Sequence, residues 1–172
     1  MKVIAFSGSP HKRGNVARLI KLLSFEIGAF GKFEILPSLN IAPCKECHAC
    51  KKTGFCIIKS DQWGGVAKSM LKSNLIIIGS PVYFYDMSGS LKMFLDRTYS
   101  LWHKRQLKGK KIIVCIVGSH GAKEALDTLC LWAQAHEMKI IATITSTYDK
   151  PRGIEKDKNV RQEVKKIKKQ FK

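Results

Sequence analysis

Four of the six cysteines in this chain crowd into one short segment, with the spacing C-x2-C-x2-C-x5-C over Cys44, Cys47, Cys50 and Cys56. Thiolates bind iron and zinc, and they also take part in redox chemistry. Three cysteines within seven residues suit a cubane iron–sulfur cluster, because each thiolate binds a different iron. The same C-x2-C-x2-C run supplies three ligands in bacterial ferredoxins. Cys56 would then be the fourth ligand.

Two other interpretations of these cysteines stay open. A zinc site usually has two C-x2-C pairs that are separated by a longer stretch, which this segment lacks. Disulfides are disfavoured in a reducing compartment, and cysteines three residues apart bridge poorly. His48 lies among the cysteines, and we expect it to face solvent or to support a ligand rather than to be one. Cys115 and Cys130 lie within apolar segments and are expected in the core.

The stretch "SGSPHKRGNVARL", residues 7–19, has the composition of a phosphate-binding loop. It follows an apolar run and opens a helical pattern, where free backbone N–H groups attract anions. The spacing fits neither a Walker A loop nor a G-x-G-x-x-G dinucleotide loop. A loop for a single phosphate remains, with positive charge from His11, Lys12 and Arg13. The alternative is a plain strand-to-helix turn in which Asn15 caps the helix.

Two more strand ends are rich in glycine and serine, "GSPVYFYD" at 79–86 and "GSHGAK" at 118–123. In open α/β sheets, ligands bind at the carboxyl ends of the strands. The aromatic residues of "YFY" offer a stacking face to a flat ligand. The alternative is that they are core residues at the end of a strand.

Strand-like and helix-like segments alternate five times, which predicts a doubly wound α/β domain with a five-stranded parallel sheet and helices on both faces. We expect strands at 2–9, 32–40, 74–84, 110–121 and 138–147, and helices at 15–27, 61–73, 88–104 and 122–137. We expect one domain over 1–172, with a cysteine-rich loop inserted at 40–60. The last helix, at 155–171, is amphipathic, with an apolar stripe of Val160, Val164, Ile167 and Phe171.

The formal net charge is +18, and residues 150–172 contribute +7 of it, with ten Lys/Arg against three Asp/Glu. Aromatic residues do not alternate with the basic ones as they do in single-strand nucleic-acid binders. We therefore interpret the charge as attraction to an acidic protein partner rather than to nucleic acid. No apolar run approaches the roughly 20 residues of a membrane span, and the apolar start is too short for a signal peptide. We expect a cytoplasmic protein without membrane attachment.

"SGSPHKRGN" followed later by "GSPVYFYDMSGSLKMFLDR" resembles the flavodoxin-like NAD(P)H-dependent FMN reductases over nearly the whole chain. The resemblance implies a sheet of order 2-1-3-4-5 that holds FMN without a covalent bond. It implies that the FMN phosphate is surrounded by Ser7, Ser9, His11, Gly14, Asn15 and Val16. It implies that the flavin ring is lined by Pro81, Val82, Tyr83 and Phe84, and at its far edge by Ser119, His120 and Gly121.

Two positions depart from the pattern of that family. It often has threonine where this chain has Val16, and arginine or lysine where it has His11. A lost hydroxyl removes a hydrogen bond worth about 1–3 kcal/mol to a charged acceptor. We therefore expect weaker FMN binding, supported by the backbone N–H of Val16.

The cysteine segment resembles that of the iron–sulfur flavoproteins, a branch of the same family. This resemblance implies a [4Fe–4S] cluster on Cys44, Cys47, Cys50 and Cys56, and a homodimer or tetramer in which the cluster lies near a neighbouring subunit's FMN. Asp96 and Arg97 also match the family, and we expect them to support the structure or a subunit contact.

The expected function is electron transfer from an acidic, ferredoxin-like donor to a small acceptor such as a quinone, oxygen or peroxide. No side chain need act as an acid or a base, so we assign no catalytic residue. A second hypothesis is an NAD(P)H-dependent FMN or quinone reductase without a cluster. A third, of a different class, is a basic nucleic-acid-binding module.

Overall fold

A parallel sheet forms the centre of the computed structural model, which describes residues 1–171. The sheet order is β2-β1-β3-β5-β6, as the 2-1-3-4-5 prediction requires. A two-residue strand, β4, pairs antiparallel with the end of β3. The strands are β1 (Val3–Ser7), β2 (Lys32–Ile35), β3 (Leu75–Tyr83), β4 (Asp86–Met87), β5 (Lys111–Val117) and β6 (Lys139–Ser146).

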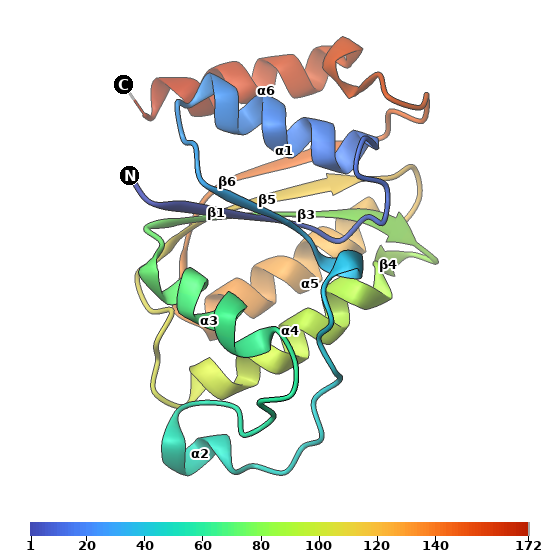
Figure 1. Ribbon diagram of the computed structural model, residues 1–172. Coiled ribbons are helices and arrows are strands. Elements are labelled where there is room, and N and C mark those ends of the chain that lie inside the picture. Colours follow the sequence, from blue (N-terminus) through green and yellow to red (C-terminus); the bar gives the residue numbers. More distant parts are fainter. Residues whose placement is uncertain (172) are drawn as a thin grey trace.

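Helices cover both faces of the sheet, which confirms the doubly wound prediction (Figure 1). One face carries α1 (Asn15–Glu26) and α6 (Lys158–Lys169). The opposite face carries α3 (Trp63–Lys72), α4 (Gly89–Trp102) and α5 (Ala122–Ala135). A single turn, α2 (Cys50–Thr53), lies in the cysteine loop, and the short 3-10 helices are η1 (Leu36–Ser38) and η2 (Ile154–Lys156).

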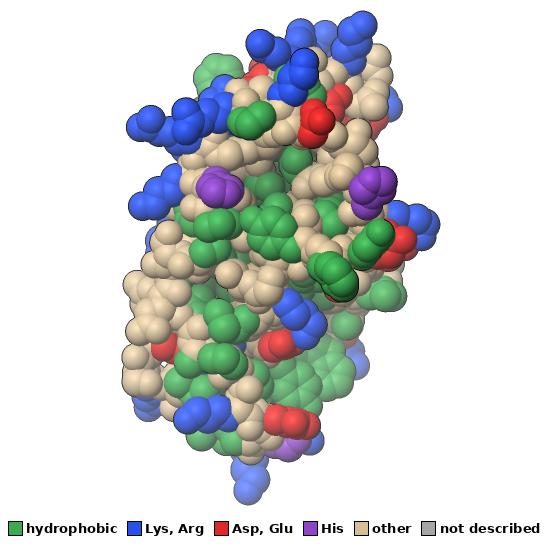
Figure 2. Space-filling view, turned by 90° about the vertical axis from the view of Figure 1, so that its right-hand side faces the viewer, with side chains coloured by type: hydrophobic (Ala, Val, Ile, Leu, Met, Phe, Trp, Pro, Cys, Tyr) green, Lys and Arg blue, Asp and Glu red, His purple; other side chains and the backbone are tan. Residues whose placement is uncertain are grey.

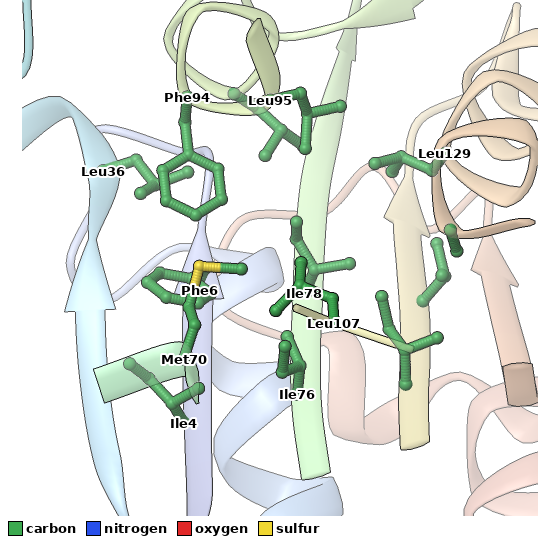
Figure 3. Packing of buried hydrophobic residues seen from close by; sticks show 14 of the residues in the cluster. Ile4, Phe6, Leu36, Met70, Ile76, Ile78, Phe94, Leu95, Leu107 and Leu129 are labelled. Carbon is green, nitrogen blue, oxygen red and sulfur yellow. The ribbon is translucent and has the colours of Figure 1, made fainter. Parts of the chain in front are cut away.

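Two hydrophobic clusters, one on each face, hold the helices to the sheet. Successive residues of β3 alternate between them: Ile76 and Ile78 face α3, α4 and α5, whereas Leu75 and Ile77 face α1 and α6. Figure 3 shows the first cluster, in which Ile76 and Ile78 lie near residues of neighbouring elements. All four β3 side chains are fully buried. Burial on both faces explains why this strand is a continuous apolar run.

Some element boundaries differ from those expected. The helix expected at 61–73 begins at Trp63, and Asp61 precedes it and accepts a hydrogen bond from the Trp63 N–H at 3.1 Å. The second strand stops at Ile35, where η1 with its Pro37 begins. The expected helix over 155–171 is divided into η2 and α6. Within residues 1–171, no helix is long and apolar enough to cross a membrane.

A buried histidine lies at the end of α5. His136 is 4% exposed, and its Nε2 lies 3.0 Å from the hydroxyl of Thr98. The indole N–H of Trp132 donates to the same hydroxyl at 2.8 Å. Burial lowers the pKa of His136 to about 4. The folded chain therefore keeps this imidazole neutral at pH values where an exposed histidine takes up a proton.

We expect the free energy of unfolding to fall as the pH drops from about 6.5 to about 4. Over that window the unfolded chain takes up a proton at residue 136 and the folded chain does not, which costs up to about 3 kcal/mol of stability. A His136→Gln variant should lose less stability between pH 7 and pH 4 in urea-unfolding measurements. The exposed His120→Gln variant is the control, and equal pH dependence in both variants would contradict this assignment.

Candidate functional site

Three loops that follow β1, β3 and β5 meet at the carboxyl edge of the sheet. The Gly8 N–H donates to the Gly79 carbonyl at 2.8 Å, and the Ser88 hydroxyl donates to the Gly8 carbonyl at 2.8 Å. The third loop packs on the second so closely that a Cβ on Gly121 would lie 2.3 Å from the Cα of Tyr85. The structure thus brings together the three glycine- and serine-rich strand ends.

The first loop borders a basic pocket, lined by His11, Lys12, Arg13, Gly14, Asn15, Pro151 and Arg152. Its backbone is held by serine hydroxyls: Ser7 Oγ accepts from the Ser9 N–H at 3.3 Å, and Ser9 Oγ accepts from the His11 N–H at 3.2 Å. Gly14 precedes α1 and brings no side chain to cap the free amides of its first turn. Those amides and the surrounding cations suit a phosphate.

The side chain of Asn15 is not the helix cap that the alternative interpretation expected, since Gly14 occupies that position. It donates to the carbonyls of Tyr148 and Lys150, at 3.3 and 3.0 Å, and accepts from the Gly153 N–H at 3.1 Å. These hydrogen bonds hold the 148–153 segment next to the first loop, and Arg152 of that segment lines the pocket. No signal in the sequence pointed to Arg152, because the contact joins residues far apart in the chain.

The second loop presents its aromatic side chains to solvent: Tyr83 is 47% exposed, Phe84 98% and Tyr85 63%. The alternative that these residues are core is therefore wrong. Phe84 and Tyr85 adopt positive φ angles of 48° and 67°, which are unusual for bulky residues. Such strain persists only where surrounding contacts hold it, and it is common at ligand sites.

The remaining predicted residues surround this loop. Pro81 and Val82 are half-buried, whereas Ser119 and His120 are exposed. Figure 2 looks onto this edge and shows hydrophobic side chains gathered across its middle, with histidines on either side. The edge thus combines a basic pocket with an exposed aromatic surface. That combination fits a ligand with a phosphate at one end and a flat ring at the other.

The four clustered cysteines line one pocket below α4, together with Arg97 and Tyr99. Cys50 begins α2 and is buried, Cys56 is half-buried, and Cys44 and Cys47 are exposed. Within residues 1–171, no three His, Cys, Asp or Glu side chains are already gathered as metal ligands. Four thiols that line one pocket are the set of donors that a thiolate-bound cluster requires.

The surroundings of this pocket affect the protonation of the Cys50 thiol. Burial raises the pKa of the Cys50 thiol, its backbone hydrogen bond opposes that shift, and the neighbouring thiols of Cys56, Cys44 and Cys47 reinforce it. His48 is exposed, with Nε2 4.0 Å from the carboxylate of Glu46. It faces solvent, as expected.

A buried ion pair lies directly beside the cysteines. Arg97 donates to the carboxylate of Asp61 through both terminal nitrogens, and its Nη2 lies 3.4 Å from the Sγ of Cys56. Burial alone would raise the pKa of Asp61, but hydrogen bonds from Arg97 and from the amides of Ala42 and Trp63 outweigh it and hold that pKa below its usual range. Arg97 is one of three polar residues on the buried face of α4, with Thr98 and Ser100.

The rest of the cysteine loop is tied to its surroundings at both ends. The Ala42 N–H donates to Asp61 at 3.0 Å, and the side-chain amide of Gln106 donates to the Gly54 carbonyl at 2.5 Å. In Figure 1 this loop lies below α3 and α4, on the opposite side of the sheet from α1. The cysteine loop and helix α1, whose first residue lines the basic pocket, therefore lie on opposite sides of the sheet.

Comparison with known families agrees with this geometry. The sequence model of the NADPH-dependent FMN reductases matches residues 1–150. The chain belongs to this family. It is 39% identical over 113 residues to an iron–sulfur flavoprotein of Methanocaldococcus jannaschii, in a match that covers 64% of this chain and 58% of that protein. It is 30% identical over 149 residues to an iron–sulfur flavoprotein of Methanosarcina thermophila, covering 82% and 77% of the two chains.

These relatives place the chain in the iron–sulfur flavoprotein branch of the FMN reductase family. The chain spans little more than half of the length of the first relative. The fold also matches the structure of an archaeal flavodoxin, with a TM-score of 0.61 at 14% identity over 99% of both chains. That likeness confirms the flavodoxin-like fold.

Proposed function

We propose that this FMN reductase family member carries FMN and a [4Fe–4S] cluster, and passes electrons from a ferredoxin-like donor to a small acceptor. The observation that carries the proposal is the pocket that all four clustered cysteines line together with the buried Arg97. A cluster passes single electrons and a flavin takes one or two, so the two groups together would couple one-electron delivery to two-electron reduction. A cytoplasmic location belongs to the same proposal.

In the proposed FMN site, the phosphate lies against the α1 amides and the basic pocket. The phosphate ligands are Ser7, Ser9, His11, Gly14, Asn15 and Val16. Because its side-chain amide is engaged by the 148–153 loop, Asn15 would contribute its backbone N–H. The ring lies on Pro81, Val82, Tyr83 and Phe84, with Ser119, His120 and Gly121 at its far edge. Exposure of the aromatic loop supports this assignment, since an exposed ring is free to stack.

The proposed cluster ligands are Cys44, Cys47, Cys50 and Cys56. Their loop lies away from the phosphate pocket of the same chain (Figure 1), which favours electron transfer to the FMN of a neighbouring subunit. An aromatic groove with Tyr99, Trp102 and Trp132 adjoins Cys44 and offers a surface for that contact. We therefore include a homodimer or tetramer in the proposal.

The second candidate is an NAD(P)H-dependent FMN or quinone reductase that uses the same flavin site without a cluster. The cysteines of the described residues are not gathered at ligand positions, which is the observation in its favour. Anaerobic mixing of the reconstituted protein with reduced ferredoxin or with NADPH separates the two candidates. The proposal expects flavin reduction to be faster with ferredoxin, whereas reduction by NADPH alone would favour the second candidate.

We expect the acidic donor to dock at the cysteine loop, where Lys51 and Lys52 are exposed on α2. A Lys51→Glu/Lys52→Glu variant should slow reduction by ferredoxin at least about tenfold at low salt, because steering by opposite charges is lost. Stopped-flow rates at several ionic strengths measure the effect, which salt should diminish.

The matched control reverses two exposed lysines on the other side of the sheet, Lys165 and Lys169 of α6. That variant has the same net charge as the first and should react at nearly the wild-type rate. Equal slowing by both variants would show that the donor responds to net charge rather than to a docking site at the cysteine loop.

A further inference from the structure

Arg97 is a fully buried cation on the stripe of α4 that faces the protein interior. Its side chain is 0% exposed, and the carboxylate of Asp61 is 3% exposed. Arginine is rarely buried unless its charge is paired and its donors are used. The groups that Arg97 contacts therefore indicate the role of this buried arginine.

The guanidinium contacts two groups of the cysteine loop and the carboxylate of Asp61, which follows that loop. Its Nη1 donates to the Ala42 carbonyl at 2.6 Å and to Asp61 Oδ2 at 2.5 Å. Its Nη2 lies 3.4 Å from Asp61 Oδ1 and 3.4 Å from Cys56 Sγ. Its Cζ lies over the ring of Trp63, 5.5 Å from the ring centre. One nitrogen is thus directed at the sulfur of a proposed cluster ligand.

In the ion pair of Arg97 and Asp61, the positive partner is the one that contacts the sulfur of Cys56. The arginine touches Cys56, and the balancing carboxylate of Asp61 binds the guanidinium and the amides of Ala42 and Trp63. A thiolate that binds iron accepts hydrogen bonds more strongly than a thiol. Positive charge and hydrogen bonds at the sulfurs favour the more negative, reduced state of a cluster.

We propose that Arg97 positions Cys56 as a ligand and raises the reduction potential of the cluster, and that Asp61 limits this effect. The inference rests on the proposed function, since it requires a cluster on these cysteines. Arg97 is a positioning residue, because it acts on the cluster through Cys56 and the loop.

Two substitutions should shift the potential in opposite directions. Arg97→Lys keeps the charge but cannot reach Asp61, Ala42 and Cys56 at once, so the cluster should become harder to reduce. Asp61→Asn leaves the arginine uncompensated, so the cluster should become easier to reduce. We expect each shift to reach about tenfold in the reduction equilibrium, equal to about 59 mV for one electron.

The experiment is an anaerobic redox titration of the full chain, loaded with cluster and followed by electron paramagnetic resonance. The control is Lys92→Gln, which removes an exposed positive charge from the same helix and should leave the potential unchanged. If Arg97→Lys does not fold, Asp61→Asn still tests the proposal, because it retains the arginine. Chelator resistance of the loaded cluster is a second readout, which Arg97→Lys should diminish.

Shifts of the same sign in both variants, or no shift in either, would overturn the proposal and leave Arg97 a purely structural residue. A wild-type chain that takes up no iron during reconstitution would overturn the proposed function as well. The two failures are therefore distinguishable, since the first requires a cluster-loaded wild type and the second lacks one.

Discussion

A Cys50→Ala variant should purify with FMN and without its cluster. Cys50 is the buried cysteine of the loop and begins α2. Its thiolate would therefore bind the cluster on the side that faces the protein interior. Alanine cannot replace that ligand, and a cluster with one open iron site is exposed to loss. Iron content should fall from about four atoms per chain to nearly none. The FMN content should stay unchanged, because the proposed flavin loops lie at the sheet edge and do not include α2.

Cys130→Ala is the matched control, because it removes a half-buried thiol of α5 outside the cysteine loop. It should keep both iron and FMN. Iron and flavin assays after anaerobic purification measure both variants. If Cys50→Ala lost FMN together with iron, the segment would be mainly structural. If it kept its iron, Cys50 would not be a ligand.

A Gly121→Ala variant should bind FMN roughly 100-fold more weakly, a loss of about 2.8 kcal/mol. Gly121 has φ +79°, which L-residues rarely adopt, and an added Cβ would lie 2.3 Å from the Cα of Tyr85. The backbone of the aromatic loop would have to move away from its present position. The sheet beneath should stay folded, because Gly121 lies at the edge beyond β5.

The structure offers a close control in Gly109, which has a similar φ of +74° but no atom within 4 Å of an added Cβ. Gly109→Ala carries the conformational cost without the contact, and it should bind FMN normally. Fluorescence titration with FMN gives both dissociation constants. Equal weakening in the two variants, or normal binding by Gly121→Ala, would contradict the assignment of the 118–121 loop to the flavin site.

Periodicity predicted the large elements well because each of them is long and has a clear face. β3 was evident as an apolar run, and α1 and α6 as helical stripes. The strand order needed the resemblance to a family, since alternation alone does not specify which strands pair. The turn α2 and the strand β4, of four and two residues, are too short for a periodic signal.

The candidate site was predictable where local composition carried the signal and not where distant segments meet. The glycine- and serine-rich strand ends were visible in the sequence, because loops at the same sheet edge share this composition. Arg152 lines the basic pocket beside the first loop, and Asn15 of that loop is hydrogen-bonded to the 148–153 segment that carries Arg152. The contact of Arg97 with Cys56 joins residues 41 positions apart, so no local pattern could reveal it.

The measurement that tests the central claim most directly is a cofactor assay on the full chain purified without oxygen. Iron, acid-labile sulfide, zinc and FMN should be determined per chain on the same sample. The proposal predicts about four irons, about four sulfides and about one FMN, with no zinc. Zinc in place of iron, or FMN without iron, would contradict it.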